Sequence, residues 1–126
     1  MAAASSNLES CDAKEATNRV AVRLREQIGD ISNILLATLP GIEEEVLDCF
    51  SAILPNERIF GGSAADNTDA GEWSLLSEDG VFSAILSAVG LKADVSFGSC
   101  LLPPYEKRDQ LAKITKCEGR FIYESL

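Results

Sequence analysis

The chain has 126 residues, a formal net charge of −9 and no histidine. Its length suits one small domain with a single core, and its acidity argues against nucleic acid or an anionic membrane surface as partner, because both require a basic face. The lack of histidine excludes Ser-His-Asp and Cys-His nucleophile systems and histidine-containing zinc sites. We therefore expect a binding protein that is not an enzyme, with no catalytic residue, cofactor or metal ion.

The cysteines and the N-terminal segment bear on the compartment. None of the four cysteines belongs to a C-x-x-C pair, which argues against a metal knuckle or a thioredoxin-type motif. The first ten residues, MAAASSNLES, have neither the positive charge nor the apolar run of a signal peptide, and no stretch has transmembrane length. We expect reduced thiols and a cytoplasmic protein.

The first segments predict a tail and a helix. Residues 1–10 are small and polar and are predicted to be a flexible tail, followed by a single domain over residues 11–126. Asp12, with Glu15 three positions later, has the pattern of a capping box, and Gly29 is typical of a helix end. Between them, apolar residues recur at helical spacing, at Ala13, Ala16, Val20, Leu24 and Ile28.

The next segments predict a parallel strand pair. The apolar run Asn33–Thr38 is too short for a helix and is typical of a central strand buried on both faces. Three glutamates at residues 43–45 mark the first turn of a second helix, which ends before Pro55. Residues 58–60 begin another strand. This order predicts a small βαβ-type layer with parallel strands and a right-handed crossover.

The second half of the chain predicts antiparallel hairpins. Residues 72–77 alternate in polarity, Asp79-Gly80 is a strong turn signal, and residues 81–89 have strand-like alternation. We also expect a strand over residues 93–97, a stiff connector at residues 103–104, and a last hairpin in which residues 112–116 and 120–124 flank Glu118-Gly119. The fold class is therefore α/β, with parallel strands followed by antiparallel hairpins.

A glycine-rich segment after the second parallel strand is the candidate site. Ligands collect outside the carboxyl ends of parallel strands, which is where residues 61–67 are expected. Gly61 and Gly62 allow close approach of the backbone and can aim amides at an anion. The segment lacks the spacing of a phosphate loop or a dinucleotide fingerprint. The alternative interpretation is that the glycine pair simply makes a turn.

Neighbouring side chains fit a small zwitterion. Ser63, Asp66 and Asn67 supply a hydroxyl, a carboxylate and an amide, and Trp73 could form one wall of a pocket. The alternatives are that the Asx residues cap backbone groups and that Trp73 belongs to the core. The predicted ligand is a small polar molecule such as an amino acid.

Three segments in order resemble the FIST domain family. They are LLATLPG at residues 35–41, IFGGSAADN at residues 59–67, and AKITKCEGRFIYES at residues 112–125. The chain resembles the second half of that family's N-terminal domain over residues 12–126, without the C-terminal domain, so we expect a partial FIST-like domain. The resemblance implies an intracellular sensor of small ligands in signal transduction, from a family sometimes found beside F-box segments. The ligand-binding residues it implies are Gly61, Gly62, Ser63, Ala64, Asp66 and Asn67.

Two functions follow from these patterns. The first is a non-catalytic sensory module, or a remnant of one, that binds a small polar metabolite. The alternative is a protein–protein interaction or scaffold domain that pairs through an exposed sheet edge, because a partial α/β sheet leaves an edge strand unpaired. The expected protein partners are then a second copy of the chain or a complementing chain.

Overall fold

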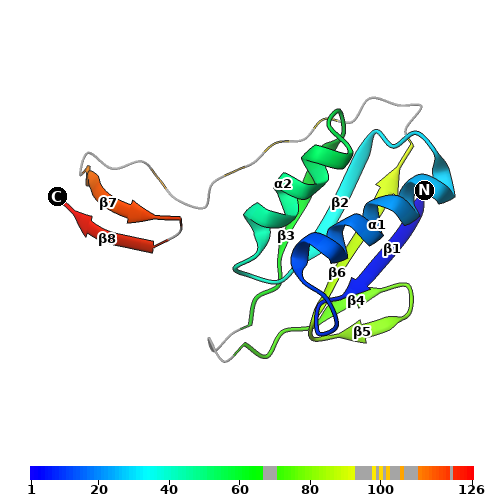
Figure 1. The fold of residues 1–126 in the computed structure, drawn as a ribbon, viewed down its shortest axis with the longest axis horizontal. Helices are drawn as coiled ribbons and strands as arrows, with labels where there is room; N and C mark the ends of the chain where they lie inside the picture. The colour runs from blue at the N-terminus through cyan, green and yellow to red at the C-terminus, as the bar shows by residue number, and fades with distance from the viewer. Residues whose placement is uncertain are drawn as a thin grey trace.

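The computed structural model describes residues 1–66, 71–92, 98, 100, 102, 106, 111–119 and 121–126. Within these residues, helices α1 (Ala13–Ile28) and α2 (Glu43–Ile53) cover one face of a four-stranded sheet (Figure 1). No helix in the described ranges is long and apolar enough to cross a membrane.

The sheet has the strand order β1-β6-β2-β3. Its strands are β1 (Ala2–Asn7), β2 (Asn33–Thr38), β3 (Arg58–Ser63) and β6 (Ile85–Leu91). β2 and β3 are parallel, whereas β6 lies between β1 and β2 and is antiparallel to both. The predicted α/β class and the parallel pair joined by α2 are therefore confirmed.

Helix α1 begins and ends where the sequence predicts. The Asp12 carboxylate accepts a hydrogen bond of 2.7 Å from the amide of Glu15, and the Gly29 amide donates 2.8 Å to the Arg25 carbonyl. Val20 and Leu24 are fully buried on the face that contacts the sheet. The side chain of Glu15 does not complete the capping box, because it pairs with Arg19 one turn later.

The expectation of a flexible tail over residues 1–10 is wrong for Ala2–Asn7, which forms edge strand β1. Ala4 is fully buried and Ala2 nearly so, because α1 packs directly over this strand. Short side chains allow the helix to approach closely. The small residues of β1 are therefore part of the packed interface between this strand and α1.

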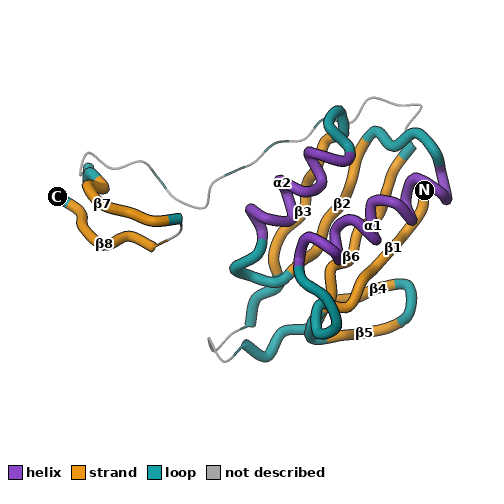
Figure 2. The backbone as a smooth tube through the Cα atoms, in the orientation of Figure 1, coloured by secondary structure: helices purple, strands orange, loops and turns teal. Residues whose placement is uncertain are grey.

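Of the helices in the described residues, none lies on the opposite face of the sheet (Figure 2). Ile34, Leu36 and Thr38 of β2 point to the helical side and are buried, whereas Leu35 is 44% exposed. The expectation that β2 is buried on both faces is therefore wrong, because both helices pack on the same side.

The hairpins of the second half form with small shifts. β4 (Leu75–Ser77) pairs with β5 (Gly80–Phe82), and β7 (Ile114–Glu118) pairs with β8 (Phe121–Ser125) around Gly119. The run predicted as one strand over residues 81–89 is divided, because β5 ends at Phe82 and β6 begins at Ile85. The predictions for residues 93–97 and 103–104 lie outside the described residues.

Gly61 fixes how closely β3 can approach β2. Its φ angle is +144°, and a Cβ atom there would lie 1.8 Å from the carbonyl oxygen of Leu36. Only glycine can adopt this backbone and leave the neighbouring strand in bonding distance. At Gly62, by contrast, a Cβ atom would meet nothing within 4 Å.

The two glycines should therefore respond differently to alanine. We expect Gly61→Ala to lower the free energy of unfolding by about 3 kcal/mol or more, because the methyl group would strike the β2 backbone. Gly62→Ala should stay within about 1 kcal/mol of the parent chain. Urea denaturation of both variants measures the difference, and equal losses would contradict the assigned β2–β3 geometry.

Candidate functional site

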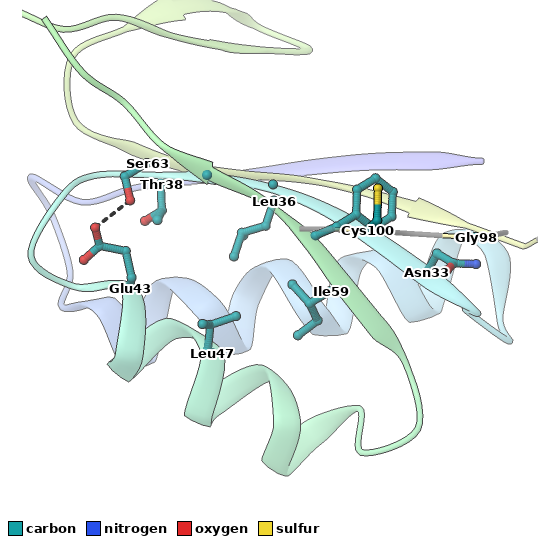
Figure 3. A pocket seen from close by; sticks show the side chains of 12 residues that line it. Asn33, Leu36, Thr38, Glu43, Leu47, Ile59, Ser63, Gly98 and Cys100 are labelled. Carbon is teal, nitrogen blue, oxygen red and sulfur yellow. Dashed lines mark hydrogen bonds between the residues drawn. The ribbon is translucent and has the colours of Figure 1, made fainter. Parts of the chain in front are cut away.

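A hollow of about 710 Å³ runs along β3 beside α2 (Figure 3). This volume lies in the range of small-molecule sites. The hollow has a polar end, an apolar middle, and a second end that Asn33, Gly98 and Cys100 help to line. Its lining residues are Asn33, Leu36, Thr38, Glu43, Leu47, Ile59, Phe60, Gly61, Gly62, Ser63, Gly98 and Cys100.

The polar end lies where the parallel strands finish. Thr38 ends β2 and Ser63 ends β3, so parallel pairing places them side by side. Glu43 is the first residue of α2, and its carboxylate stands near the positive end of the helix dipole. Ser63 Oγ donates a 2.6 Å hydrogen bond to Glu43 Oε1, and the Gly41 amide donates 2.7 Å to Oε2. This end matches the usual ligand position in α/β sheets.

Thr38 carries a buried hydroxyl that has no hydrogen-bond partner in the described part of the chain. Its side chain is 2% exposed, and Oγ1 makes no hydrogen bond among the described residues. A buried polar group in that condition costs roughly 1–3 kcal/mol. Figure 3 shows the side chain at the same end of the hollow as Ser63 and Glu43. A polar atom of a bound molecule could satisfy this hydroxyl.

The middle of the hollow is apolar. Leu36 and Ile59 line it from the sheet, and Leu47 lines it from α2. Leu47 is 41% exposed, so the apolar surface is open to solvent on the helix side. A ligand with a hydrocarbon part next to its polar group would bury that part here.

The backbone of β3 offers hydrogen-bonding groups at the edge of the sheet. The Arg58 amide donates to the Ser32 carbonyl at 3.3 Å, and the Ala64 amide donates to the Thr38 carbonyl at 2.8 Å. Backbone groups alternate in direction along a strand, so the even-numbered amides between them also face β2. The amides and carbonyls of Ile59, Gly61 and Ser63 therefore point outward.

The glycine pair is thus part of a strand. Residues Gly61, Gly62 and Ser63 belong to β3 and line the hollow, but only Gly61 and Ser63 have outward amides, since the Gly62 amide faces β2. The expectation of a loop with two adjacent available glycine amides is corrected on this point. Ala64 is half-buried, and its amide is the one bonded to Thr38.

Two other predicted site residues lie away from the hollow. Asp66 Oδ2 accepts a 2.9 Å hydrogen bond from the amide of Glu72, which is the backbone role weighed for an Asx residue. Trp73 is half-buried, and its Nε1 donates 3.1 Å to the Ser83 carbonyl. Neither lines the hollow. Asn67 lies outside the described residues.

The sequence interpretation missed Thr38 and Glu43. Thr38 is the one hydroxyl in an otherwise apolar strand ending, and Glu43 was assigned only to the helix dipole. A polar residue that ends a buried parallel strand, followed by an acidic helix start, is the pattern that indicates both. In the described part of the chain, no three Cys, Asp or Glu side chains form a group that could hold a metal ion.

Comparison with known proteins identifies the family. The model of the FIST N domain matches residues 1–124, which include β1 as well as both helices and the last hairpin. No curated protein and no solved structure matches the chain significantly. FIST domains are sensory domains of signal transduction. With almost its whole length covered by the family model, the chain belongs to the FIST N domain family.

Proposed function

We propose that this chain is a non-catalytic sensory module that binds a small polar ligand in the hollow between β3 and α2. The observation that carries the proposal is the buried Thr38 hydroxyl, which lines the hollow without a hydrogen-bond partner among the described residues. Native proteins rarely leave such a group unsatisfied, so each case calls for an occupant or another explanation.

The groups around the Thr38 hydroxyl favour a ligand that carries both a positive and a negative charge. The Glu43 carboxylate attracts an ammonium group, while the outward amides of Gly61 and Ser63 can donate to a carboxylate. The apolar middle of the hollow would hold a short hydrocarbon side chain. An amino acid or a similar small metabolite combines these features.

Binding is favoured over catalysis by the chemistry of the polar end. Ser63 donates a hydrogen bond to Glu43, but a carboxylate is far too weak a base to remove the serine proton, and the chain has no histidine to take it. This hydrogen bond therefore fixes the positions of the Ser63 and Glu43 side chains. A ligand at this end would connect β3 to α2, and a change in how tightly they are coupled would carry the signal.

Replacing the unpaired hydroxyl should stabilise the empty protein. We expect Thr38→Val to raise the free energy of unfolding by about 1 kcal/mol, because it removes an unsatisfied buried polar atom and keeps the branched shape. The matched control is Thr17→Val, since Thr17 is equally buried but its Oγ1 donates 2.7 Å to the Ala13 carbonyl. That control should lower stability by roughly 0.5–1.5 kcal/mol. Urea titrations in which both changes destabilise the chain would remove the argument from Thr38.

Ligand binding itself can be tested by calorimetry with free amino acids, small amines and small carboxylic acids. We expect at least one compound to bind, with Thr38→Val and Glu43→Gln each weakening its Kd about tenfold, which is the effect of losing one well-placed hydrogen bond or charge. Glu45→Gln is the control, because Glu45 lies in the same helix turn but does not line the hollow. Absence of binding, or equal effects of Glu43→Gln and Glu45→Gln, would count against the proposal.

A further inference from the structure

The hollow beside β3 is longer than a single amino acid. Its lining follows β3 from Ile59 to Ser63 and includes Asn33 and Thr38, the two ends of β2. At about 3.3 Å per residue, the six residues of β2 span roughly 16 Å. An extended chain covers at most about 3.6 Å per residue, so one amino acid occupies only part of that length, whereas roughly three to five residues fill it.

The edge of β3 offers its hydrogen-bonding groups at the repeat of a strand partner. The outward amides and carbonyls belong to Ile59, Gly61 and Ser63, which are every second residue. Among the described strands, β2 is the one that pairs with β3. A free amino acid has one amine and one carboxylate, whereas an extended peptide repeats its amide and carbonyl groups at the same interval as β3. The spacing along the hollow therefore favours a peptide backbone.

The polar end of the hollow favours the amino terminus of such a peptide. The buried Thr38 hydroxyl and the Glu43 carboxylate lie together at this end (Figure 3). A terminal amine carries a positive charge and three N–H donors, so it suits both groups, whereas a terminal carboxylate would be repelled by Glu43. Because this end is where β3 finishes, a peptide that begins here and continues along the hollow runs antiparallel to β3.

The position of Glu43 sets the register of the added strand. Its carboxylate accepts the 2.6 Å hydrogen bond from Ser63, so a terminal amine reaches it when the first peptide residue lies opposite Ser63. The third peptide residue then lies opposite Gly61 and donates its amide to that edge, while the amide of the second residue faces away. Paired residues share a face, and Gly61 pairs with Leu36 on the helical side. The third side chain therefore points to the apolar middle, which Leu47 lines from α2.

We propose that the hollow binds the free amino-terminal end of a short peptide, which adds to β3 as an antiparallel strand. This inference rests on the proposed function, because it uses the same hollow, and it names peptides as the class of ligand. The amine lies at Thr38 and Glu43, the backbone pairs with Ser63 and Gly61, and an apolar third residue lies against Leu47. A free amino acid occupies only the polar end and binds more weakly.

Calorimetry with the full chain and three probes separates the two levels of the proposal. The probes are leucine, the tripeptide Leu-Ala-Leu and the same tripeptide with an acetylated amine. We expect the Kd of the tripeptide to be at least about tenfold lower than that of leucine, and acetylation to raise it about tenfold or more by removing the charge. Leucine that binds as tightly as the tripeptide overturns this inference and leaves the proposed function intact. If no probe and no compound of the wider screen binds, the proposed function fails as well.

Methylation of single peptide amides tests the strand pairing. A methyl group on the amide of the third residue should raise the Kd about tenfold or more, because that amide faces β3. The same group on the second residue is the matched control and should change the Kd by less than about twofold. Equal effects of the two methyl groups overturn the added strand.

The position of the amine is tested by Glu43→Gln, measured with both tripeptides. We expect the variant to bind the free tripeptide about tenfold more weakly and the acetylated tripeptide as the unaltered chain does, because only the free amine carries a charge for Glu43 to attract. An equal loss of affinity for both tripeptides contradicts the assigned end of the hollow.

Discussion

The parallel pairing of β2 with β3 through Gly61 is the constraint on which the site and the open edge depend. With any other residue at that position, a side chain would collide with the Leu36 backbone and separate the strands. Because they do pair, Thr38 and Ser63 end side by side, and the short connection to α2 brings Glu43 to the same point. The same pairing leaves alternate backbone groups of β3 facing away from the sheet. A hollow with a polar end and a strand edge that pairs with no other described strand thus arise from one local geometry.

Much of the fold could be predicted from the sequence, because its signals are local. The Asp12 cap and Gly29 define α1, and an uninterrupted apolar run defines β2 to the residue. The turn signals at Asp79-Gly80 and Glu118-Gly119 likewise predict both hairpins. β1 could not be found in this way. Alanines and serines without an apolar pattern resemble a loose tail, and only the approach of α1 makes their short side chains useful in a strand.

The candidate site was predictable in position but only partly in composition. Gly61 and Ser63 line the hollow, as their place after a parallel strand indicated. Thr38 and Glu43 were missed because their contribution depends on contacts across the strand–helix connection; Ser63 and Glu43, for instance, are 20 residues apart in sequence. Trp73 is directed elsewhere by the β4–β5 hairpin, where its indole bonds to the Ser83 carbonyl. Residue type indicates which groups can bind a ligand, whereas strand register decides which of them meet.

Amide hydrogen exchange along β3 tests the central geometry most directly, measured by NMR under conditions where the chain sediments as a monomer. The assigned register predicts alternation: slow exchange at Phe60, Gly62 and Ala64, whose amides face β2, and fast exchange at Gly61 and Ser63, whose amides face outward. Similar protection at all five amides would contradict the account, because β3 would then have a strand on both sides.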